Sequence, residues 1–249
     1  MRKQDLSPVE KRRYEKHIMI PEIGEQGQLR LLSARVLVVG AGGLGCPVLQ
    51  YLCAAGVGTI GIVEYDKVSD SNLHRQILYG TGDIGKLKSI ITRQRLNHQN
   101  DDVKIDVFNI SLEESNARSI FRDYDLVIDA TDNYKTRYLI NDVCVEQKKP
   151  MVHGAIYKFE GQVSVFNFKG GPDYRLYNPE KDIQKNNPLP SESGLLGVLP
   201  GITGTYMANE TIKIITGIGT VLSGKILIFN ILNNSSYFVN IPGSNSNKQ

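Results

Sequence analysis

From residue 35 onward the chain alternates short apolar runs with stretches of helical periodicity. Strands are predicted at 35–39, 59–63, 103–108, 125–129 and 150–153. Helices are predicted between them at 46–55, 85–98 and 134–147. Buried strands separated by helices are typical of a parallel sheet with crossover helices. The sequence therefore predicts an α/β fold built on a Rossmann-like, doubly wound and mostly parallel sheet.

Beyond residue 160 polar and apolar residues alternate with a period of two. The segments 161–168, 225–230 and 236–241 show this pattern, which predicts antiparallel strands that extend the sheet. The stretch 169–194 is rich in Pro, Gly, Asn and Ser, and a loop of this length in a compact domain is usually functional or mobile. A further helix is predicted at 203–216.

The first 32 residues are predicted to form a helical arm. Ser7 and Pro8 suit the N-cap and first position of a helix, and the residues after them are charged along much of the arm. A solvent-exposed amphipathic helix is the simplest interpretation of that charge. The chain is predicted to be a single domain over 1–249, with a helical arm (1–32), a core (33–160), a sheet extension and crossover loop (161–243), and a disordered tail (244–249).

Composition and charge narrow the classes of function. The formal net charge of +3 is too small to indicate nucleic acid or an anionic membrane as a partner. No run approaches the roughly 18 apolar residues of a membrane span, and no secretory signal is visible, so a cytoplasmic protein is expected. The three cysteines and four histidines show no spacing for a disulfide, zinc or nucleophile framework, so they are interpreted as structural or solvent-facing.

A glycine loop follows the first predicted strand. Gly40, Gly42 and Gly45 match a dinucleotide fingerprint in the required context, with a strand before them and a helix after them. The first glycine allows the tight turn, and the second lets the backbone approach phosphate near the helix N-terminus. Glu64 ends the second strand, where an acceptor for ribose hydroxyls is expected. The core is therefore predicted to bind a nucleotide.

Two cations after this loop favour phosphate chemistry over hydride chemistry. Arg75 and Lys88 follow the polar pair Ser71 and Asn72 within one βα unit of Glu64. Such cations neutralise a triphosphate and the charge that develops when an α-phosphorus is attacked. Taken singly, either side chain would be interpreted as a solvated surface charge, and a nicotinamide pocket has no need of both.

A candidate metal ligand follows the apolar strand 126–129. Asp132 and Asn133 lie just past it, at the carboxyl edge of a parallel sheet, where ligands bind in doubly wound folds. Asp132 is a candidate ligand for Mg²⁺, which uses one or two carboxylates together with phosphate oxygens and water. The alternative is that Asp132 or Asn133 is the N-cap of the next helix, and both roles are compatible.

Together these motifs resemble the MoeB/ThiF/HesA family, relatives of the adenylation domain of ubiquitin-activating enzymes. The resemblance extends from about residue 13 to residue 229 and includes five ordered motifs, at 40–45, 71–76, 129–133, 160–162 and 194–201. It implies ATP- and Mg²⁺-dependent adenylation of the C-terminal Gly-Gly of a small ubiquitin-like sulfur-carrier protein, similar to MoaD or ThiS, with release of pyrophosphate. It also implies a homodimer.

The resemblance implies roles for individual residues. By this likeness ATP is held by Gly43, Glu64, Ser71, Asn72 and Arg75. Lys88 would support the α-phosphate, and Asp132 the metal. The position of the family's arginine finger, contributed by the neighbouring subunit, is occupied by Lys16, which keeps the charge but loses the planar two-pronged donor. Either a lower rate or substitution by Arg13 would follow.

Two departures from the family pattern concern zinc and a cysteine. The first Cys-x-x-Cys pair of many members falls at 173–176, where this chain has Asp-Tyr-Arg-Leu, and the second is absent, so no zinc is predicted. The family's loop cysteine before Glu192 matches Leu189-Pro190-Ser191. Proline has no nucleophile, so the chemistry is expected to stop at the acyl-adenylate unless another protein supplies the thiol.

The predicted function is adenylation of a sulfur carrier for molybdopterin or thiazole biosynthesis. A non-catalytic relative that binds a nucleotide or a partner protein is the main alternative, motivated by the missing cysteine and by Lys16. An NAD-dependent oxidoreductase would rest on the glycine loop alone. A family dehydratase that activates a tRNA-borne carboxylate is disfavoured by the small net charge and the lack of a basic extension.

Overall fold

The apolar runs of the sequence form one mixed sheet in the computed structural model, which describes residues 4–179 and 194–241. In these residues the strand order is β3-β2-β1-β4-β5-β6-β7-β8. The strands are β1 (Arg35–Val39), β2 (Thr59–Val63), β3 (Lys104–Phe108), β4 (Leu126–Asp129), β5 (Met151–Tyr157), β6 (Glu160–Phe166), β7 (Lys225–Asn230) and β8 (Ser235–Asn240). The predicted fold class and the predicted strands are confirmed.

Helices connect the strands and surround the sheet. They are α1 (Pro8–Arg13), α2 (Glu15–Ile18), α3 (Gly24–Ser33), α4 (Gly45–Ala54), α5 (Lys88–Gln99), α6 (Glu114–Phe121), α7 (Tyr134–Glu146), α8 (Tyr174–Tyr177) and α10 (Val198–Thr216). Short 3₁₀ turns lie at Asp70–Asn72 and Thr81–Asp83. No helix among the described residues is long and apolar enough to cross a membrane.

The order of the parallel strands predicts where a ligand binds. β3, β2, β1, β4 and β5 run parallel, and β1 pairs with β2 on one side and with β4 on the other. The chain leaves β1 toward β2 but reaches β4 only later, so the direction of winding reverses between β1 and β4. In an open α/β sheet ligands bind in the crevice beyond the carboxyl ends of strands at such a point.

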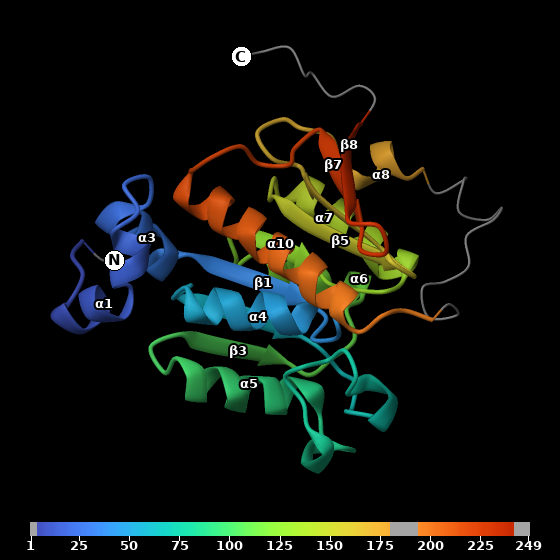
Figure 1. The fold of residues 1–249 in the computed structure, drawn as a ribbon, viewed down its shortest axis with the longest axis horizontal. Coiled ribbons are helices and arrows are strands. Elements are labelled where there is room, and N and C mark those ends of the chain that lie inside the picture. Colours follow the sequence, from blue (N-terminus) through green and yellow to red (C-terminus); the bar gives the residue numbers. More distant parts are fainter. Residues whose placement is uncertain (1–3, 180–193, 242–249) are drawn as a thin grey trace.

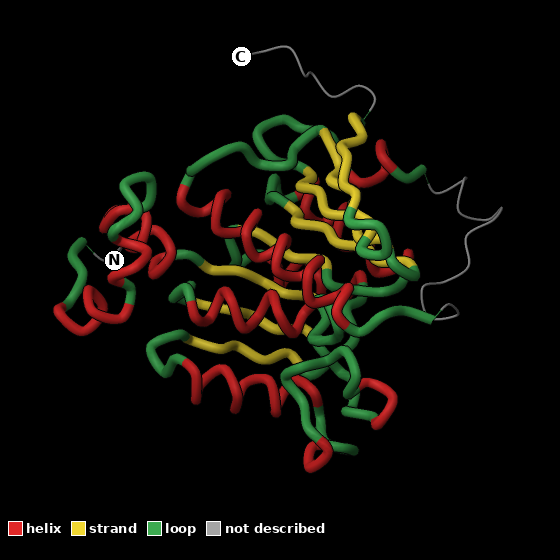
Figure 2. Tube along the Cα trace, viewed as in Figure 1, coloured by secondary structure: helices red, strands yellow, loops and turns green. Residues whose placement is uncertain are grey.

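Two apolar layers cover the two faces of the sheet (Figures 1 and 2). Alternate residues of β1 serve different layers: Val36 and Val38 pack with α4 and α10, whereas Leu37 and Val39 pack with α6 and α7. This division follows from the period of two in a strand. It explains why the β1 run is apolar at every position from Val36 to Val39.

The remaining strands extend the sheet in antiparallel fashion. β5 turns into β6 through a two-residue connection, and β7 and β8 continue to the edge. Lys158 in the β5–β6 turn has φ of +52°, the left-handed conformation that tight hairpins require. β8 is exposed along its whole length.

The helical regions differ from the prediction in four places. The arm is three helices and not one: Tyr14, with φ of −104° and ψ of 17°, separates α1 from α2, and α3 begins at Gly24, with φ of +54°, after Pro21, which lacks an N–H. α10 begins at Val198, before the predicted start, since Pro200 lies in the first turn, where its missing N–H costs nothing. α6 and α8 were not predicted. The tail at 244–249 and most of the crossover loop lie outside the described residues.

Candidate active site

A cavity of about 300 Å³ opens at the carboxyl ends of β1, β2 and β4. Eight of the residues predicted for the site line it together: Gly40, Gly42, Gly43, Glu64, Arg75, Lys88, Asp132 and Asn133. They come from five separate segments of the chain that the parallel sheet brings to one edge. The structure thus places these eight residues around one cavity, and their individual roles remain predictions.

The glycine loop is packed so tightly at Gly40 and Gly45 that no side chain fits at these two positions. Gly40 has φ of +97°, and a Cβ there would lie 2.7 Å from the carbonyl oxygen of Ala130. A Cβ on Gly45 would lie 2.1 Å from the carbonyl oxygen of Gly40. The loop after β1 thus lies directly against the loop after β4, which brings the fingerprint and Asp132 to one cavity.

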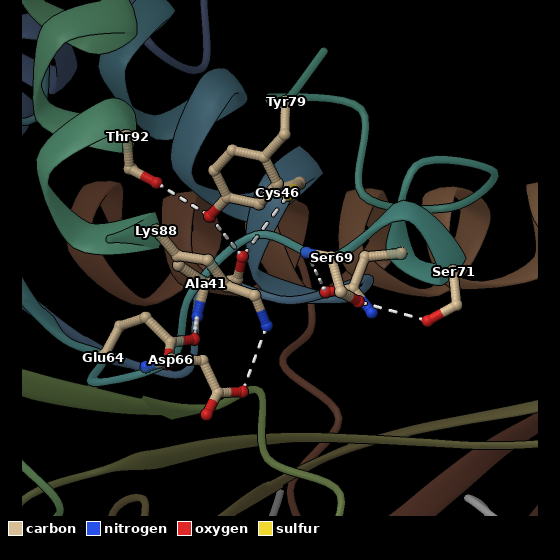
Figure 3. Close-up of polar contacts among 10 residues, drawn as sticks. Ala41, Cys46, Glu64, Asp66, Ser69, Ser71, Tyr79, Lys88 and Thr92 are labelled. Atoms are coloured by element: carbon tan, nitrogen blue, oxygen red, sulfur yellow. Dashed lines mark hydrogen bonds and ion pairs between the residues drawn. The ribbon is translucent and has the colours of Figure 1, made fainter. Parts of the chain in front are cut away.

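Ala41 is the anchor of the glycine loop (Figure 3). The Glu64 carboxylate accepts a hydrogen bond from the Ala41 N–H at 2.9 Å, and the Tyr79 hydroxyl donates to the Ala41 carbonyl at 2.7 Å. Tyr79 also bonds Thr92 on α5, and burial raises the pKa of the Tyr79 hydroxyl, which keeps it a donor. The two peptide units that flank the Ala41 Cα are therefore both held before any ligand arrives.

Glu64 has a structural role as well as its predicted ribose role. Its second oxygen accepts from the Asp66 N–H at 2.8 Å, so each carboxylate oxygen has a backbone partner. The side chain is buried but borders the cavity. A carboxylate oxygen has a further lone pair, so these bonds leave capacity for a ribose hydroxyl.

Lys88 lies at the base of the cavity as the first residue of α5. Its side chain is 5% exposed, and its ammonium pairs with the half-exposed carboxylate of Asp66 at 3.1 Å. A buried cation at a helix N-terminus opposes the helix dipole. A site that binds an anion there would offset that cost, which makes Lys88 the strongest phosphate candidate in the cavity.

Arg75 is positioned by its own turn. One guanidinium nitrogen donates to the Ser71 carbonyl at 2.8 Å and lies 2.9 Å from the His74 ring nitrogen. Asn72 accepts from the Ser69 N–H and ends the 3₁₀ turn. The described structure places Ser71 and Asn72 outside the cavity lining, where they shape the turn that delivers Arg75.

The structure assigns the N-cap at α7 to one of the two candidates. The Asn133 side chain accepts from the Thr136 N–H at 2.9 Å, while the exposed Asp132 carboxylate is not the cap. No group of three metal-ligating side chains occurs in the described residues. A single carboxylate beside Lys88 and Arg75 nevertheless fits Mg²⁺, because this ion is usually bound by one or two carboxylates together with substrate phosphates.

Behind the cavity, the end of β4 carries a buried polar cluster. Asp129 is fully buried, and it accepts from His153 Nδ1 at 2.7 Å with the Arg137 guanidinium 3.7 Å away. Burial lowers the pKa of His153 and keeps its ring neutral. Burial would raise the pKa of Asp129, but the hydrogen bond from His153 and the Arg137 charge outweigh it and lower that pKa.

The predicted arm cation lies at the other end of the sheet. α1 and α3 lie beside the start of β1, far from the cavity (Figure 1). Lys16 is 82% exposed there, whereas Arg13 bonds the Gln99 carbonyl at 3.0 Å and pairs with Asp102. Lys16 makes exposed contacts within the arm, with Glu15 at 3.5 Å and the Met19 sulfur at 3.8 Å, whereas Arg13 fixes the arm to the end of α5.

The segment that replaces the first cysteine pair is anchored by aromatic packing. Asp173 caps α8, and Tyr174 is buried against Tyr138 and Phe166. Arg175 bonds both oxygens of Asp142 at 2.7 Å. These contacts hold α8 on α7 without any metal ligand. Pro190 and Glu192 lie outside the described residues.

Several cavity residues were not predicted. Asp66, Gln76 and Arg137 line it, as does the loop 110–112 after β3. The signal for that loop was available, since β3 is parallel to β2 and its carboxyl end must reach the same edge. Arg137 gave no sequence signal, because a single arginine within a helix is typical of an exposed face.

The model of the ThiF family matches residues 14–249 of the chain. The chain belongs to the ThiF family. The family predicted from the five motifs is confirmed by this match.

Members of the ThiF family with curated names are similar to most of the chain. A sulfur carrier protein adenylyltransferase of Thermus thermophilus is 48% identical over 225 residues, which are 88% of this chain and 83% of that protein. A probable molybdopterin-synthase adenylyltransferase of Porphyra purpurea is 49% identical over 88% of this chain and 58% of that protein. A probable adenylyltransferase/sulfurtransferase MoeZ of Mycobacterium tuberculosis is 46% identical over 91% of this chain and 59% of that protein. The chain thus spans less than two thirds of the latter two.

Solved structures share the fold at low sequence identity. PaaA has a TM-score of 0.82 at 22% identity, with 96% of this chain and 85% of that chain covered. Escherichia coli MccB crystallised with ATP has a TM-score of 0.80 at 18% identity, with 93% of this chain and 73% of that chain covered. These likenesses confirm the ThiF-type arrangement of parallel core and antiparallel extension.

Proposed function

We propose that the chain is a single adenylation domain that activates the C-terminal Gly-Gly carboxylate of a small ubiquitin-like sulfur-carrier protein with ATP. The observation that carries this proposal is the lining of one cavity by Lys88, Arg75 and Asp132 beside a nucleotide-type glycine loop. The names of the curated relatives, which are adenylyltransferases for sulfur carriers or molybdopterin synthase, agree with it.

The reaction is an in-line displacement at the α-phosphorus. A carboxylate oxygen of the carrier's last glycine forms a bond to that phosphorus while the bond to the bridging oxygen breaks, and pyrophosphate leaves. No general base is required, because the attacking carboxylate is ionised at neutral pH. The chain therefore contributes by positioning the reactants and by stabilising charge.

Three side chains divide this work. Lys88 stabilises the negative charge on the α-phosphoryl oxygens from the base of the cavity, and Arg75 holds the outer phosphates from the rim. Asp132 would hold Mg²⁺, which neutralises triphosphate charge and aids departure of pyrophosphate when bound. The side-chain oxygen of Asn133 keeps α7 capped and so fixes the loop that carries Asp132.

A second copy of the chain completes the site. Lys16 is exposed on α2, which contacts α1 and α3 at the opposite end of the sheet (Figure 1), so in its own subunit it is remote from the phosphates. A homodimer in which each arm reaches the other cavity would add a positive charge near the departing phosphates. Lysine supplies the charge without the bidentate geometry of arginine.

The product of this chain is then a carrier acyl-adenylate. The three cysteines are buried, and burial raises the pKa of Cys46 to about 12 and that of Cys53 to about 11. None of them is placed to attack an adenylate. A sulfur donor from another protein would complete the transfer, in a cytoplasmic pathway to molybdopterin or thiazole.

The test is exchange of labelled pyrophosphate into ATP in the presence of Mg²⁺ and a purified carrier of the MoaD or ThiS type. We expect exchange with the intact carrier and none with the same carrier lacking its terminal Gly-Gly. Tight binding of NAD in place of ATP, or no exchange with any such carrier, would contradict the proposal and favour one of the two alternatives.

A further inference from the structure

Three ionisable side chains at the end of β4 have no part in the proposed chemistry. Asp129, His153 and Arg137 have side chains 0%, 3% and 6% exposed. Burial of charged groups costs free energy, and apolar side chains of similar volume often stabilise a fold equally well. The cluster therefore calls for an explanation other than stability.

Their hydrogen bonds converge on the residue before Asp132. Asp129 Oδ1 accepts from the Thr131 N–H at 3.1 Å and from the Thr131 hydroxyl at 2.5 Å. Arg137 Nη2 donates to the Thr131 carbonyl at 2.9 Å. The N–H, the hydroxyl and the carbonyl of Thr131 are thus all engaged by one buried ion pair.

His153 fixes the other half of the Asp129 carboxylate. Its Nδ1 bonds Oδ2, so the two carboxylate oxygens face different partners and the carboxyl plane is set. The ring packs against Tyr174 at 5.0 Å and Phe166 at 5.8 Å between centroids. These neighbours leave the imidazole in one orientation.

We propose that Asp129, His153 and Arg137 are positioning residues that clamp Thr131 and thereby hold the Asp132 carboxylate in place for the metal–nucleotide complex. In the part of the chain that the structure describes, Asp132 is not the cap of α7 and its side chain makes no hydrogen bond or ion pair, so its direction is set by its neighbours in the chain. Thr131 on one side and the Asn133 cap on the other fix the peptide units that flank it. This inference rests on the proposed function.

The sharpest test exploits the Thr131 hydroxyl. Thr131→Val keeps the volume and shape of the side chain but removes the donor to Asp129, whereas Thr131→Ser keeps the donor. Arg137→Lys keeps the charge but loses the planar donor to the Thr131 carbonyl. Thr211→Val is the control, because the hydroxyl of Thr211, a buried threonine, also donates a hydrogen bond, here to the Met207 carbonyl within α10.

The direct readout is affinity for Mn²⁺ in the presence of ATP and without carrier, followed by electron paramagnetic resonance. We expect Thr131→Val and Arg137→Lys to weaken Mn²⁺ binding about tenfold, the size typical for loss of a contact that orients a metal ligand. Thr131→Ser and Thr211→Val should match wild type. In carrier-dependent exchange, the first two variants should lower kcat with little change in the KM for the carrier.

The outcomes separate the two proposals. Asp132→Ala should lose Mn²⁺ binding, and if it does while Thr131→Val and Arg137→Lys bind like wild type, the positioning role is overturned and the metal role of Asp132 stands. If Asp132→Ala binds like wild type, the metal assignment fails and the positioning role fails with it. Thermal unfolding of each variant shows whether it is folded in the assay, and equal effects of Thr131→Ser and Thr131→Val would also overturn the clamp.

Discussion

Positively charged side chains have different partners at the two ends of the sheet. At the amino end, the cations bond carbonyl groups near helix C-termini: Arg30 bonds Thr216, and Lys149 bonds Arg122 at 2.9 Å together with Phe121 and Tyr124. At the carboxyl end, Lys88 and Arg75 border a cavity instead. The same residue types thus act as caps at one end and as candidate phosphate ligands at the other.

The direction of the helices explains this difference. In a βαβ unit the helix returns antiparallel to its strands, so helix C-termini gather where strands begin and N-termini gather where strands end. Where strands begin, the exposed carbonyls and the negative end of the helix dipole attract cations. Where strands end, the free N–H groups and the positive end of the helix dipole favour anions. A cation held at the second end, as Lys88 is, therefore indicates an anionic ligand.

The largest expected effect is at the carboxyl end. Arg75→Ala or Asp132→Ala should each lower carrier-dependent pyrophosphate exchange by about 10²–10³-fold or more, because each removes a group that stabilises phosphate charge. The melting temperature should stay close to wild type, since Arg75 is only partly buried and Asp132 is exposed. Exchange that survives in both variants would show that the site is assigned to the wrong cavity.

The next largest effect is expected at Lys16, a cation at the amino end of the sheet that does not cap a helix. Lys16→Ala should slow exchange by about tenfold to a hundredfold, since it removes one charge from the partner's site. Lys16→Arg should raise the rate above wild type. Exposure of this side chain predicts no loss of stability.

A mixed-dimer experiment tells whether Lys16 acts across subunits. In a dimer of Lys16→Ala with Asp132→Ala, one cavity has its own Asp132 and an intact Lys16 from the partner. Reassociated mixtures should therefore exchange pyrophosphate faster than either parent alone. A mixture no faster than the average of its parents would contradict a shared site.

Lys149→Met is the counterpart of Lys88 at the amino end. It leaves three carbonyls without their donor and should lower the free energy of unfolding by about 2 kcal/mol. Exchange at 25 °C should be unchanged, because Lys149 does not line the cavity. Chemical denaturation would check the loss of stability, and the exchange assay on the same sample would check the activity. A lower exchange rate without a loss of stability would contradict the structural role of Lys149.

The smallest effect is a pH dependence from the buried cluster. His153 faces Asp129 and Arg137, and burial lowers its pKa below the ordinary 6.5. As pH falls below 6.5, His153 becomes protonated in the unfolded chain but stays neutral in the folded chain. The free energy of unfolding therefore decreases until the pH falls below the pKa of His153 in the folded chain. His153→Gln should remove this component, and its melting temperature should fall by fewer degrees than that of wild type between pH 7 and 5.

The sequence predicted the parts of the fold that depend on local pattern. The runs at 35–39 and 59–63 had the right length and apolarity, and the observed loop requires the glycines at 40 and 45. Helix breaks were harder to predict: Pro21 and Gly24 are local signals for the break between α2 and α3, but no proline or glycine marks the break between α1 and α2 at Tyr14.

The sequence predicted the charged residues that line the candidate site but not the buried residues that support them. Lys88, Arg75 and Asp132 follow strands in the sequence, so their shared edge could be inferred from parallel topology. The contact of His153 with Asp129 joins residues 24 positions apart on two neighbouring strands, and no local pattern marks it. His153 was interpreted as structural or solvent-facing, and its burial agrees with a structural role. The sequence did not identify Asp129 as the carboxylate that His153 orients.

The most direct test of the account is ATP binding, by isothermal titration calorimetry in Mg²⁺, to wild type and a matched pair of variants. Lys88→Met and Lys149→Met delete the same ammonium group at opposite ends of the sheet. The account predicts that Lys149→Met binds ATP like wild type and that Lys88→Met binds at least about tenfold more weakly. Equal binding by Lys88→Met and wild type would contradict the assignment of the triphosphate to the carboxyl-end cavity.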